Sequence, residues 1–416
     1  MVSRIGGGPP APGLTPFLIF WLLFGAAPLL AGIFLLQSEP AHRRFWWRVL
    51  LGVLLLFLVV GADGNLGPRS WHHLLRGEKF PGTDADALTH TLVTAHLGAE
   101  ISKGRNLLWC GTFQLAWNEA CRLTGGDLQF QKEHSMIAAL NKHSFTKESL
   151  DEPSYVAMAG FVKEDIHEKI RKAVEVKFRG VFKPRFIPDK GLTPRPQDFV
   201  AYACLYKKLS FAIPFERPEE ELRFRGVLVP AFGLGPYKPS LKKVYAQVSI
   251  LDYQSEADFI IELKTQSDSD RLILAKVQPE SNLADTLTSV GKRVVTGQVE
   301  SAVTNDILLV PRIKLDLTRR YSELEGLRLV PQASGVAKDL VLMSAVQNTK
   351  FEMNERGAEL ESEAHMAFAC DKQRDPIPKH RMIFDKPFLI LMQRRDGKTP
   401  YFAFWVENPE ALVSWR

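Results

Sequence analysis

Cysteine is scarce in this chain of 416 residues, and the four that occur, Cys110, Cys121, Cys204 and Cys370, lie far apart. No two of them have the C-x-x-C spacing common to zinc sites and redox-active pairs. The sequence therefore predicts neither a disulfide framework nor a metal centre. So few cysteines do not decide the compartment in which the chain folds.

The sequence also lacks the motifs that most often reveal an enzyme. It has no G-x-S-x-G elbow, no P-loop and no G-x-G-x-x-G fingerprint after a strand. His90 and His96 do not have the spacing of about four residues that places two metal ligands on one helix face. His134 and His143 are not tied to other ligands by a recognised spacing. We expect no catalytic residues and no cofactor, and we rank a membrane enzyme last among the possible functions.

Charge of one sign is not concentrated in any part of the chain. The 53 basic residues outnumber the 47 acidic ones and give a formal net charge of +6, but the two kinds are interspersed. Nucleic acid is not an expected partner, because proteins that bind it usually carry a basic stripe or face.

Two long apolar runs lie near the start of the chain. The first, residues 15–36, is long enough to cross a hydrocarbon core of about 30 Å, and it exceeds the apolar stretch of about 7–15 residues in a signal peptide, the alternative interpretation. The second, residues 49–62, reaches spanning length when it is extended back to Phe45. We therefore expect two transmembrane helices, at about residues 15–36 and 45–62.

Basic residues set the expected orientation of this pair. Arg43, Arg44 and Arg48 lie between the two runs, whereas Arg4 alone precedes the first. Positive charge stays on the cytoplasmic side, so both ends of the pair should lie outside, although basic residues within 69–79 oppose this signal. We expect a membrane protein whose soluble domain is extracytoplasmic.

The rest of the chain divides into a Pro/Gly-rich leader (1–14), a linker (63–82) and one domain (83–416). In the domain, residues 83–102 and 163–178 have the caps and apolar stripes of helices. The apolar run in residues 198–205 is typical of a strand buried on both faces. Helices mainly first and strands mainly last favour an α+β fold with large antiparallel or mixed sheets. Further strands are predicted within residues 244–253, 258–264, 271–277, 312–317, 340–355, 386–395 and 401–408.

The end of the chain resembles the carboxyl-terminal part of a serpin. In that family a strand leads into a Glu-x-Gly-x-Glu hinge and an exposed reactive loop, and a Phe-x-x-Pro-Phe strand follows. The matching positions here are Glu355, Gly357 and Glu359 for the hinge, Phe384, Pro387 and Phe388 for the strand, and Asn408 and Pro409 for the end. Weaker matches extend the resemblance back to about residue 83. It implies a serpin-like fold with helices packed on large sheets.

Three departures from the family concern the place where its central sheet opens. Cys110 and Gly111 stand where the family commonly has Ser-Pro, and Gln347 stands where it has a histidine. Ser210 or Phe211 replaces a tryptophan. Since these family positions hydrogen-bond and pack at the opening, their loss leaves open whether this sheet opens in the same way.

The segment after the hinge alternates in character along the chain. Glu359, Glu361 and Glu363 occupy every second position, so a strand here would place all three on one face. If the loop inserts into the main sheet, as the resemblance implies, no charge falls on the inward face, where it would cost several kcal/mol. The alternative is an ordinary edge strand or an acidic loop. The inward set is Ala358, Leu360, Ser362, Ala364, Met366, Phe368 and Cys370.

The resemblance implies a membrane-anchored protease inhibitor that acts as a suicide substrate, and not an enzyme. Its partners would be the lipid bilayer and a serine or cysteine protease. The alternative is a non-inhibitory binding or scaffold module, which the bulk of Leu360 favours because it would slow insertion. The hinge residues are Glu355, Gly357, Ala358, Glu359, Leu360, Ser362 and Ala364.

Three residues are candidates for the cleaved bond. Counting from the hinge as in inhibitory serpins places Asp371 at the bond, which would suit an Asp-directed protease. Lys372 and Arg374 would suit a trypsin-like protease, and we favour this basic pair because such proteases are common.

Overall fold

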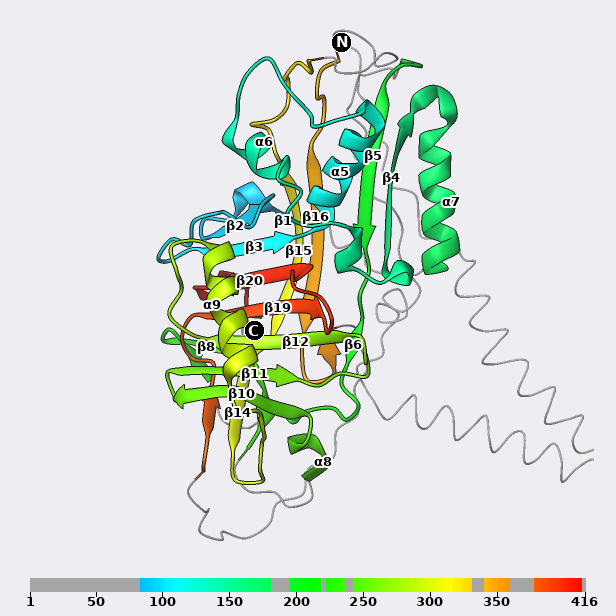
Figure 1. Cartoon of the computed structure of the whole chain (residues 1–416). Coiled ribbons are helices and arrows are strands. Elements are labelled where there is room, and N and C mark those ends of the chain that lie inside the picture. Colours follow the sequence, from blue (N-terminus) through cyan, green and yellow to red (C-terminus); the bar gives the residue numbers. More distant parts are fainter. Residues whose placement is uncertain are drawn as a thin grey trace, which may run out of the picture. The chain divides into compact units, whose positions relative to one another are not determined.

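The structure is a computed structural model that describes residues 83–180, 195–217, 222–235, 242–330, 340–358 and 378–413, all within a unit spanning Pro81–Arg416 (Figure 1). The two apolar runs expected to span a membrane lie outside these residues. Among the residues that are described, no helix is both long enough and apolar enough to cross a bilayer.

An eight-stranded mixed sheet holds most of the apolar core. Consecutive residues are buried along its central strands, because their runs of leucine, isoleucine and alanine suit a strand covered on both faces. β2 and β3 pair in parallel, and the other neighbours are antiparallel. In sheet order the strands are β13 (Glu300–Ser301), β10 (Val248–Ser255), β11 (Asp258–Leu263), β12 (Asp270–Lys276), β19 (Phe388–Arg394), β20 (Phe402–Val406), β3 (Asn106–Cys110) and β2 (Thr91–Thr94).

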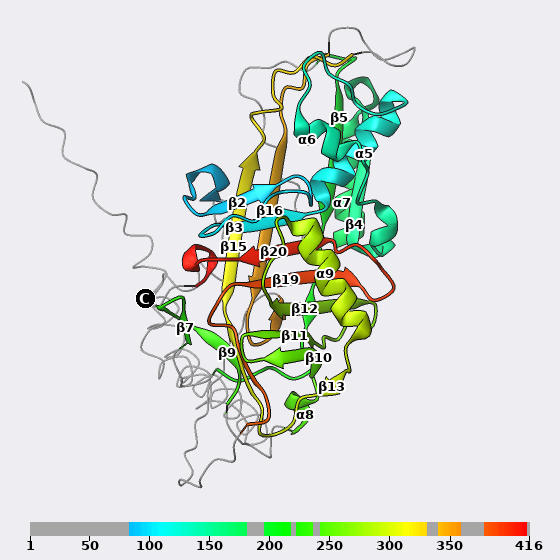
Figure 2. The same ribbon diagram turned by 60° about the vertical axis from the view of Figure 1, so that its left-hand side comes forward.

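The helix α9 (Leu283–Thr296) lies across this sheet in Figures 1 and 2. Asn282 caps its first turn by accepting the Asp285 N–H at 2.9 Å. A second, three-stranded sheet has the order β18 (Arg381–Ile383), β14 (Ile307–Pro311) and β9 (Ala231–Leu234). Smaller elements are β7 (Leu222–Phe224), β8 (Val227–Val229) and α8 (Lys242–Tyr245).

Two further sheets bear on function. One has the order β1 (Thr83–Asp84), β15 (Ile313–Arg320) and β16 (Val346–Met353), and the other pairs β4 (Tyr155–Phe161) with β5 (Phe199–Leu205). The helices α7 (Ile166–Phe178) and α5 (Thr112–Thr124) pack on the β4–β5 pair through separate apolar clusters. A short helix, α6 (Ser135–Leu140), lies beside α5.

The structure corrects three of the expectations from sequence. Residues 83–102 form β1, a 3₁₀ turn (Ala85–Ala87) and β2 rather than a helix, because the β-branched residues of β2 pair with β3 at the sheet edge. β5 is not buried on both faces, since Cys204 is its only fully buried residue. Helices and strands also alternate early in the chain. The helix expected in residues 163–178 and the later strands are confirmed.

Candidate functional site

The chain reverses direction immediately after β16. Asn354 and Gly357 exchange two backbone hydrogen bonds of 3.0 and 3.1 Å, so Glu355 and Arg356 form a two-residue turn. The Asn354 side chain accepts the Arg356 N–H at 2.9 Å, a local contact to which asparagine is well suited. The predicted hinge is therefore a defined turn that directs the chain back along β16.

Gly357 brings the chain against β6 (Leu209–Ser210). Its φ is +120°, and a Cβ at this position would lie 2.3 Å from the carbonyl oxygen of Leu209, so only glycine fits. Gly357 and Ala358 form β17, which pairs antiparallel with β6. The first two residues after the turn thus already have strand structure.

Glu355, which is buried, anchors the turn through an ion pair with the more exposed Arg217. Arg217 donates to Glu355 Oε1 from Nε at 3.0 Å and from Nη2 at 2.6 Å, and Arg312 Nε lies 3.7 Å from Oε2. Burial alone would raise the pKa of Glu355, but the hydrogen bonds from Arg217 and the charges of both arginines outweigh it and lower the pKa. The ionised carboxylate ties the hinge to segments distant in sequence.

The carboxyl ends of β5 and β16 meet at this hinge. β6 follows β5, β17 follows β16, and the two short strands pair, while Figure 1 shows β5 and β16 pointing the same way. Along their lengths, no β-ladder joins β5 to β16 among the described residues, and the two strands belong to different sheets. We call this place the β5/β16 boundary. A strand antiparallel to both has the polarity to pair with each of them.

The helix α5 supports both sides of the β5/β16 boundary. It packs against β5 and β16. Its Trp117 shares an apolar cluster with Phe199 of β5 and with Ala345, which immediately precedes β16. The two sheets are therefore joined through a common apolar layer rather than through backbone hydrogen bonds.

Gln347 fastens β16 to the start of α5. Its side-chain N–H groups donate to the Cys110 carbonyl at 2.9 Å and to Thr112 Oγ1 at 3.0 Å, and its oxygen accepts the Tyr321 hydroxyl at 2.7 Å. Burial raises the pKa of Tyr321, so that hydroxyl remains a donor. Gln347 thus has three hydrogen-bond partners from distant segments.

The other two departures from the family pattern have local packing reasons. A Cβ on Gly111 would lie 2.2 Å from the ring of Phe145, which is buried against this backbone. Phe211 is buried and packs edge-on against Phe215, with ring centroids 4.7 Å apart. Each change leaves the surrounding core filled.

The far side of the predicted loop is anchored as well. Lys276 is buried and donates to the Ile383 carbonyl at 2.7 Å and to Asp385 Oδ1 at 2.6 Å. The His380 N–H donates to Asp306 Oδ1 at 2.8 Å. The chain is therefore held to the fold on both sides of residues 359–377.

The described residues include only part of the predicted site. Glu355, Gly357 and Ala358 lie together at the hinge. Sequence reasoning missed Arg217, Arg312 and Lys276, since each contacts a residue far along the chain and no local pattern reveals it. Outside the described residues lie Glu359, Leu360, Ser362 and Ala364 of the hinge and the scissile-bond candidates Asp371, Lys372 and Arg374.

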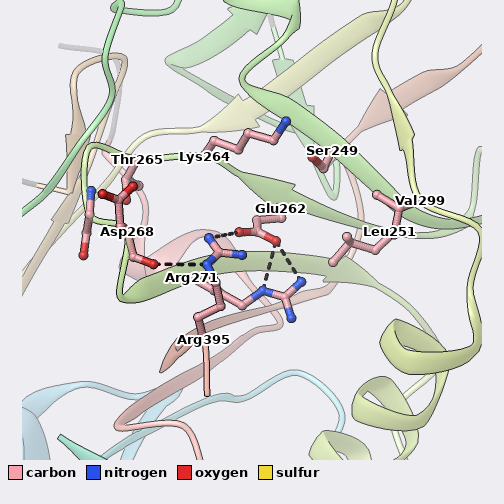
Figure 3. A pocket seen from close by; sticks show the side chains of 10 residues that line it. Ser249, Leu251, Glu262, Lys264, Thr265, Asp268, Arg271, Val299 and Arg395 are labelled. Atoms are coloured by element: carbon pink, nitrogen blue, oxygen red, sulfur yellow. Dashed lines mark hydrogen bonds and ion pairs between the residues drawn. The ribbon is translucent and has the colours of Figure 1, made fainter. Parts of the chain in front are cut away.

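A separate hollow of about 620 Å³ lies on the β10–β12 side of the eight-stranded sheet (Figure 3). Glu262 is buried there and accepts hydrogen bonds from Arg271 at 2.7 and 2.9 Å and from Arg395 at 2.8 Å. Both arginines are bound to this one carboxylate, and the lining residues present no paired nucleophile and base.

No family model and no curated protein matches the chain. Among solved structures it is similar to Serpin48 of the insect Tenebrio molitor, with 14% identity, a TM-score of 0.43, and coverage of 74% of this chain and 92% of that one. It is similar to a serpin of the trematode Schistosoma haematobium, with 15% identity, a TM-score of 0.43, and coverage of 74% and 94%. It is also similar to a thyroxine-binding globulin in complex with thyroxine, with 12% identity, a TM-score of 0.43, and coverage of 73% of this chain and 93% of that one.

Two of these three structures are named as serpins. At 12–15% identity and a TM-score of 0.43, they carry no information about activity, target or ligand. Function has to be judged from the hinge and the β5/β16 boundary of this chain.

Proposed function

We propose that the domain is a protease inhibitor of the serpin kind, in which residues 359–377 are the reactive loop. A target protease would cleave this loop and form an acyl-enzyme. The amino-terminal part of the loop would then insert at the β5/β16 boundary before the ester is hydrolysed. The observation that carries the proposal is the hinge turn, which directs β17 back along β16 at the point where β5 and β16 meet.

The pairing of the hinge supports this use of the loop. Gly357 and Ala358 already form backbone hydrogen bonds as a strand, so insertion would extend an existing strand rather than nucleate a new one. The residues that follow have the alternation expected of such a strand, because glutamates on the outward face alternate with uncharged residues on the inward face. Half-exposed side chains on β5 would be covered by an added strand.

The target is proposed to be a serine or cysteine protease, with a trypsin-like enzyme cutting at Lys372 or Arg374 as the favoured case. An Asp-directed protease would cut at Asp371 instead. We further propose that residues 15–36 and 45–62 anchor the chain in a membrane and leave this domain on the extracytoplasmic side. The support for that anchor is the length of the apolar runs and the arginines between them.

A non-inhibitory scaffold is the second candidate, and two contacts favour it. Gln347 holds β16 on α5, and Glu355 fixes the hinge through Arg217, so both resist separation of the strands. If these contacts keep insertion slow, the protease would cleave the loop and leave, and the chain would behave as a substrate.

The test is to incubate the full chain with a trypsin-like protease and look for a covalent complex that survives boiling in detergent. Ala358→Arg should abolish the complex by placing a charge on the inward face, whereas Glu359→Arg, on the outward face, should leave it. Cleavage of the wild-type chain without any complex would reject the inhibitor and favour the scaffold. Complex formation by Ala358→Arg would reject the insertion register.

A further inference from the structure

Three possible metal ligands from separate segments meet beside the far end of α5. Cys121 lies in the last turns of α5, Asp127 follows the turn after the helix, and His143 follows α6. One ligand atom from each, the cysteine sulfur, a carboxylate oxygen and an imidazole nitrogen, lies within 4.8 Å of the other two. The set combines sulfur, nitrogen and oxygen, which are the donors that zinc takes in proteins.

Local backbone geometry brings Asp127 to Cys121. Gly125 ends α5 with a φ of +83°, and the Gly126 N–H donates to the Cys121 carbonyl at 3.0 Å. This left-handed end turns the chain sharply and returns it beside the last helical turn. His143 also has a positive φ, +48°.

The imidazole of His143 is oriented by a fixed partner. Its Nδ1 lies 2.8 Å from Asn118 Oδ1. The Asn118 amide cannot be reversed, because its nitrogen donates to the Phe145 carbonyl at 2.9 Å and its oxygen accepts Gln114 Nε2 at 2.8 Å. His143 Nδ1 must therefore carry a proton, and Nε2 faces Asp127 Oδ1 at 2.7 Å.

This arrangement is that of a metal-binding histidine with its supporting residue. Histidine ligands almost always donate the other ring N–H to an oxygen, which fixes the tautomer and aims the free nitrogen. The side chains of His143 and Asp127 are 36% and 53% exposed, which leaves a route for an ion and room for a bound water. Cys121, by contrast, is buried and closes the inner side.

We propose that Cys121, Asp127 and His143 bind a zinc ion, with water as the fourth ligand, and that the ion braces α5 against the segments on either side of α6. Binding replaces the thiol proton of Cys121, which leaves to solvent. The three donor atoms need to draw in to a separation of about 3.5 Å, as tetrahedral bonds of about 2.0–2.3 Å require. This proposal does not depend on the inhibitor function.

The experiment uses the full chain in detergent with Zn²⁺ and Co²⁺ as probes. We expect one Zn²⁺ per chain in competition with a chromophoric chelator, and a thiolate-to-cobalt charge-transfer band with Co²⁺. Cys121→Ala should remove the band, and His143→Asn, whose new residue tolerates a positive φ, should weaken Zn²⁺ binding at least about tenfold. Asn118→Ala, which leaves all three ligands in place, should weaken it by roughly 10–100-fold.

Cys204→Ala is the matched control, because Cys204 is also buried but belongs to the cluster under α7. It should bind Zn²⁺ as the wild type does. Circular dichroism without metal checks that each variant is folded. Absence of Zn²⁺ binding by the wild type would overturn the proposal and leave His143 and Asp127 as a simple polar contact. A cobalt band that persists in Cys121→Ala would overturn it equally.

Discussion

The eight-stranded sheet and the β5/β16 boundary differ in how their strands are paired. β11, β12, β19 and β20 each have a hydrogen-bonded neighbour on both sides and are almost continuously buried. Among the residues that the structure describes, β5 and β16 each have one sheet neighbour, and β5 is mostly half-exposed. The central strands of the first region are paired along both edges, whereas β5 and β16 each have an edge that no β-ladder covers among the described residues.

The largest difference between the two regions should appear on truncation of a side chain. Leu274→Ala, in the fully buried β12, should lower the free energy of unfolding by about 3–4 kcal/mol, because it leaves a cavity between paired strands. Val200→Ala, on the half-buried β5, should cost about 1 kcal/mol or less. Urea unfolding of the wild type and both variants measures the two losses in the free energy of unfolding. Equal losses would mean that β5 is packed as tightly as the closed sheet.

The hinge should be the next most sensitive position. Gly357→Ala combines a φ of +120° with a Cβ only 2.3 Å from a backbone oxygen, and we expect a loss of roughly 2–3 kcal/mol. Gly226→Ala is the control, since its φ is +87° but no atom lies within 4 Å of the added Cβ, and it should cost about 1 kcal/mol. If the two variants unfold at the same urea concentration, β17 is not held against β6.

The negative charge of Glu355 should make a smaller contribution to the free energy of unfolding. Its pKa in the folded chain is below the ordinary value of 4.5, so the unfolded chain binds more protons between the two values. The stability that this carboxylate contributes is therefore complete above about pH 4.5 and is lost as the pH falls through the lower, folded pKa. Glu355→Gln should cost about 1–2 kcal/mol at neutral pH, and much less in acid.

The comparison for this variant is Glu300→Gln, which breaks the exposed pair with Lys379. Its unfolding should change little at any pH, because exposed ion pairs contribute little. Urea unfolding curves of the wild type and both variants, measured from neutral to acidic pH, give the stability difference at each pH. A gap between wild type and Glu355→Gln that does not narrow on acidification would contradict the assigned ion pair.

Sequence patterns predicted the regions where local and global preferences agree. The runs of residues 258–264, 271–277 and 386–395 became β11, β12 and β19, because apolar residues of high β propensity also suit a doubly covered sheet. The Glu-x-Gly-x motif falls on the turn after β16, where only glycine can occupy the close approach to β6. α7 was predicted for the same reason, with buried residues at Ile166, Ile170 and Val174.

The errors arose where distant segments decide the outcome. Leu88, Leu92 and Leu97 predict the apolar stripe of a helix, but pairing with β3 makes residues 91–94 a strand. The partners of Glu355 and Gln347 come from far along the chain, so composition and spacing gave no sign of Arg217 or Tyr321. Nor does the sequence indicate that Cys121, Asp127 and His143 lie close together, because their spacing follows no known metal motif.

The most direct test of the account is the melting temperature of the full chain before and after a single cut at Lys372. If the loop inserts at the β5/β16 boundary, the cut chain gains a row of backbone hydrogen bonds and buries Leu360, Met366 and Phe368, worth about 1.5–3 kcal/mol each. We predict a rise of about 10 °C or more. Ala358→Arg, cut in the same way, should show none. An unchanged or lower melting temperature of the cut wild-type chain would contradict insertion.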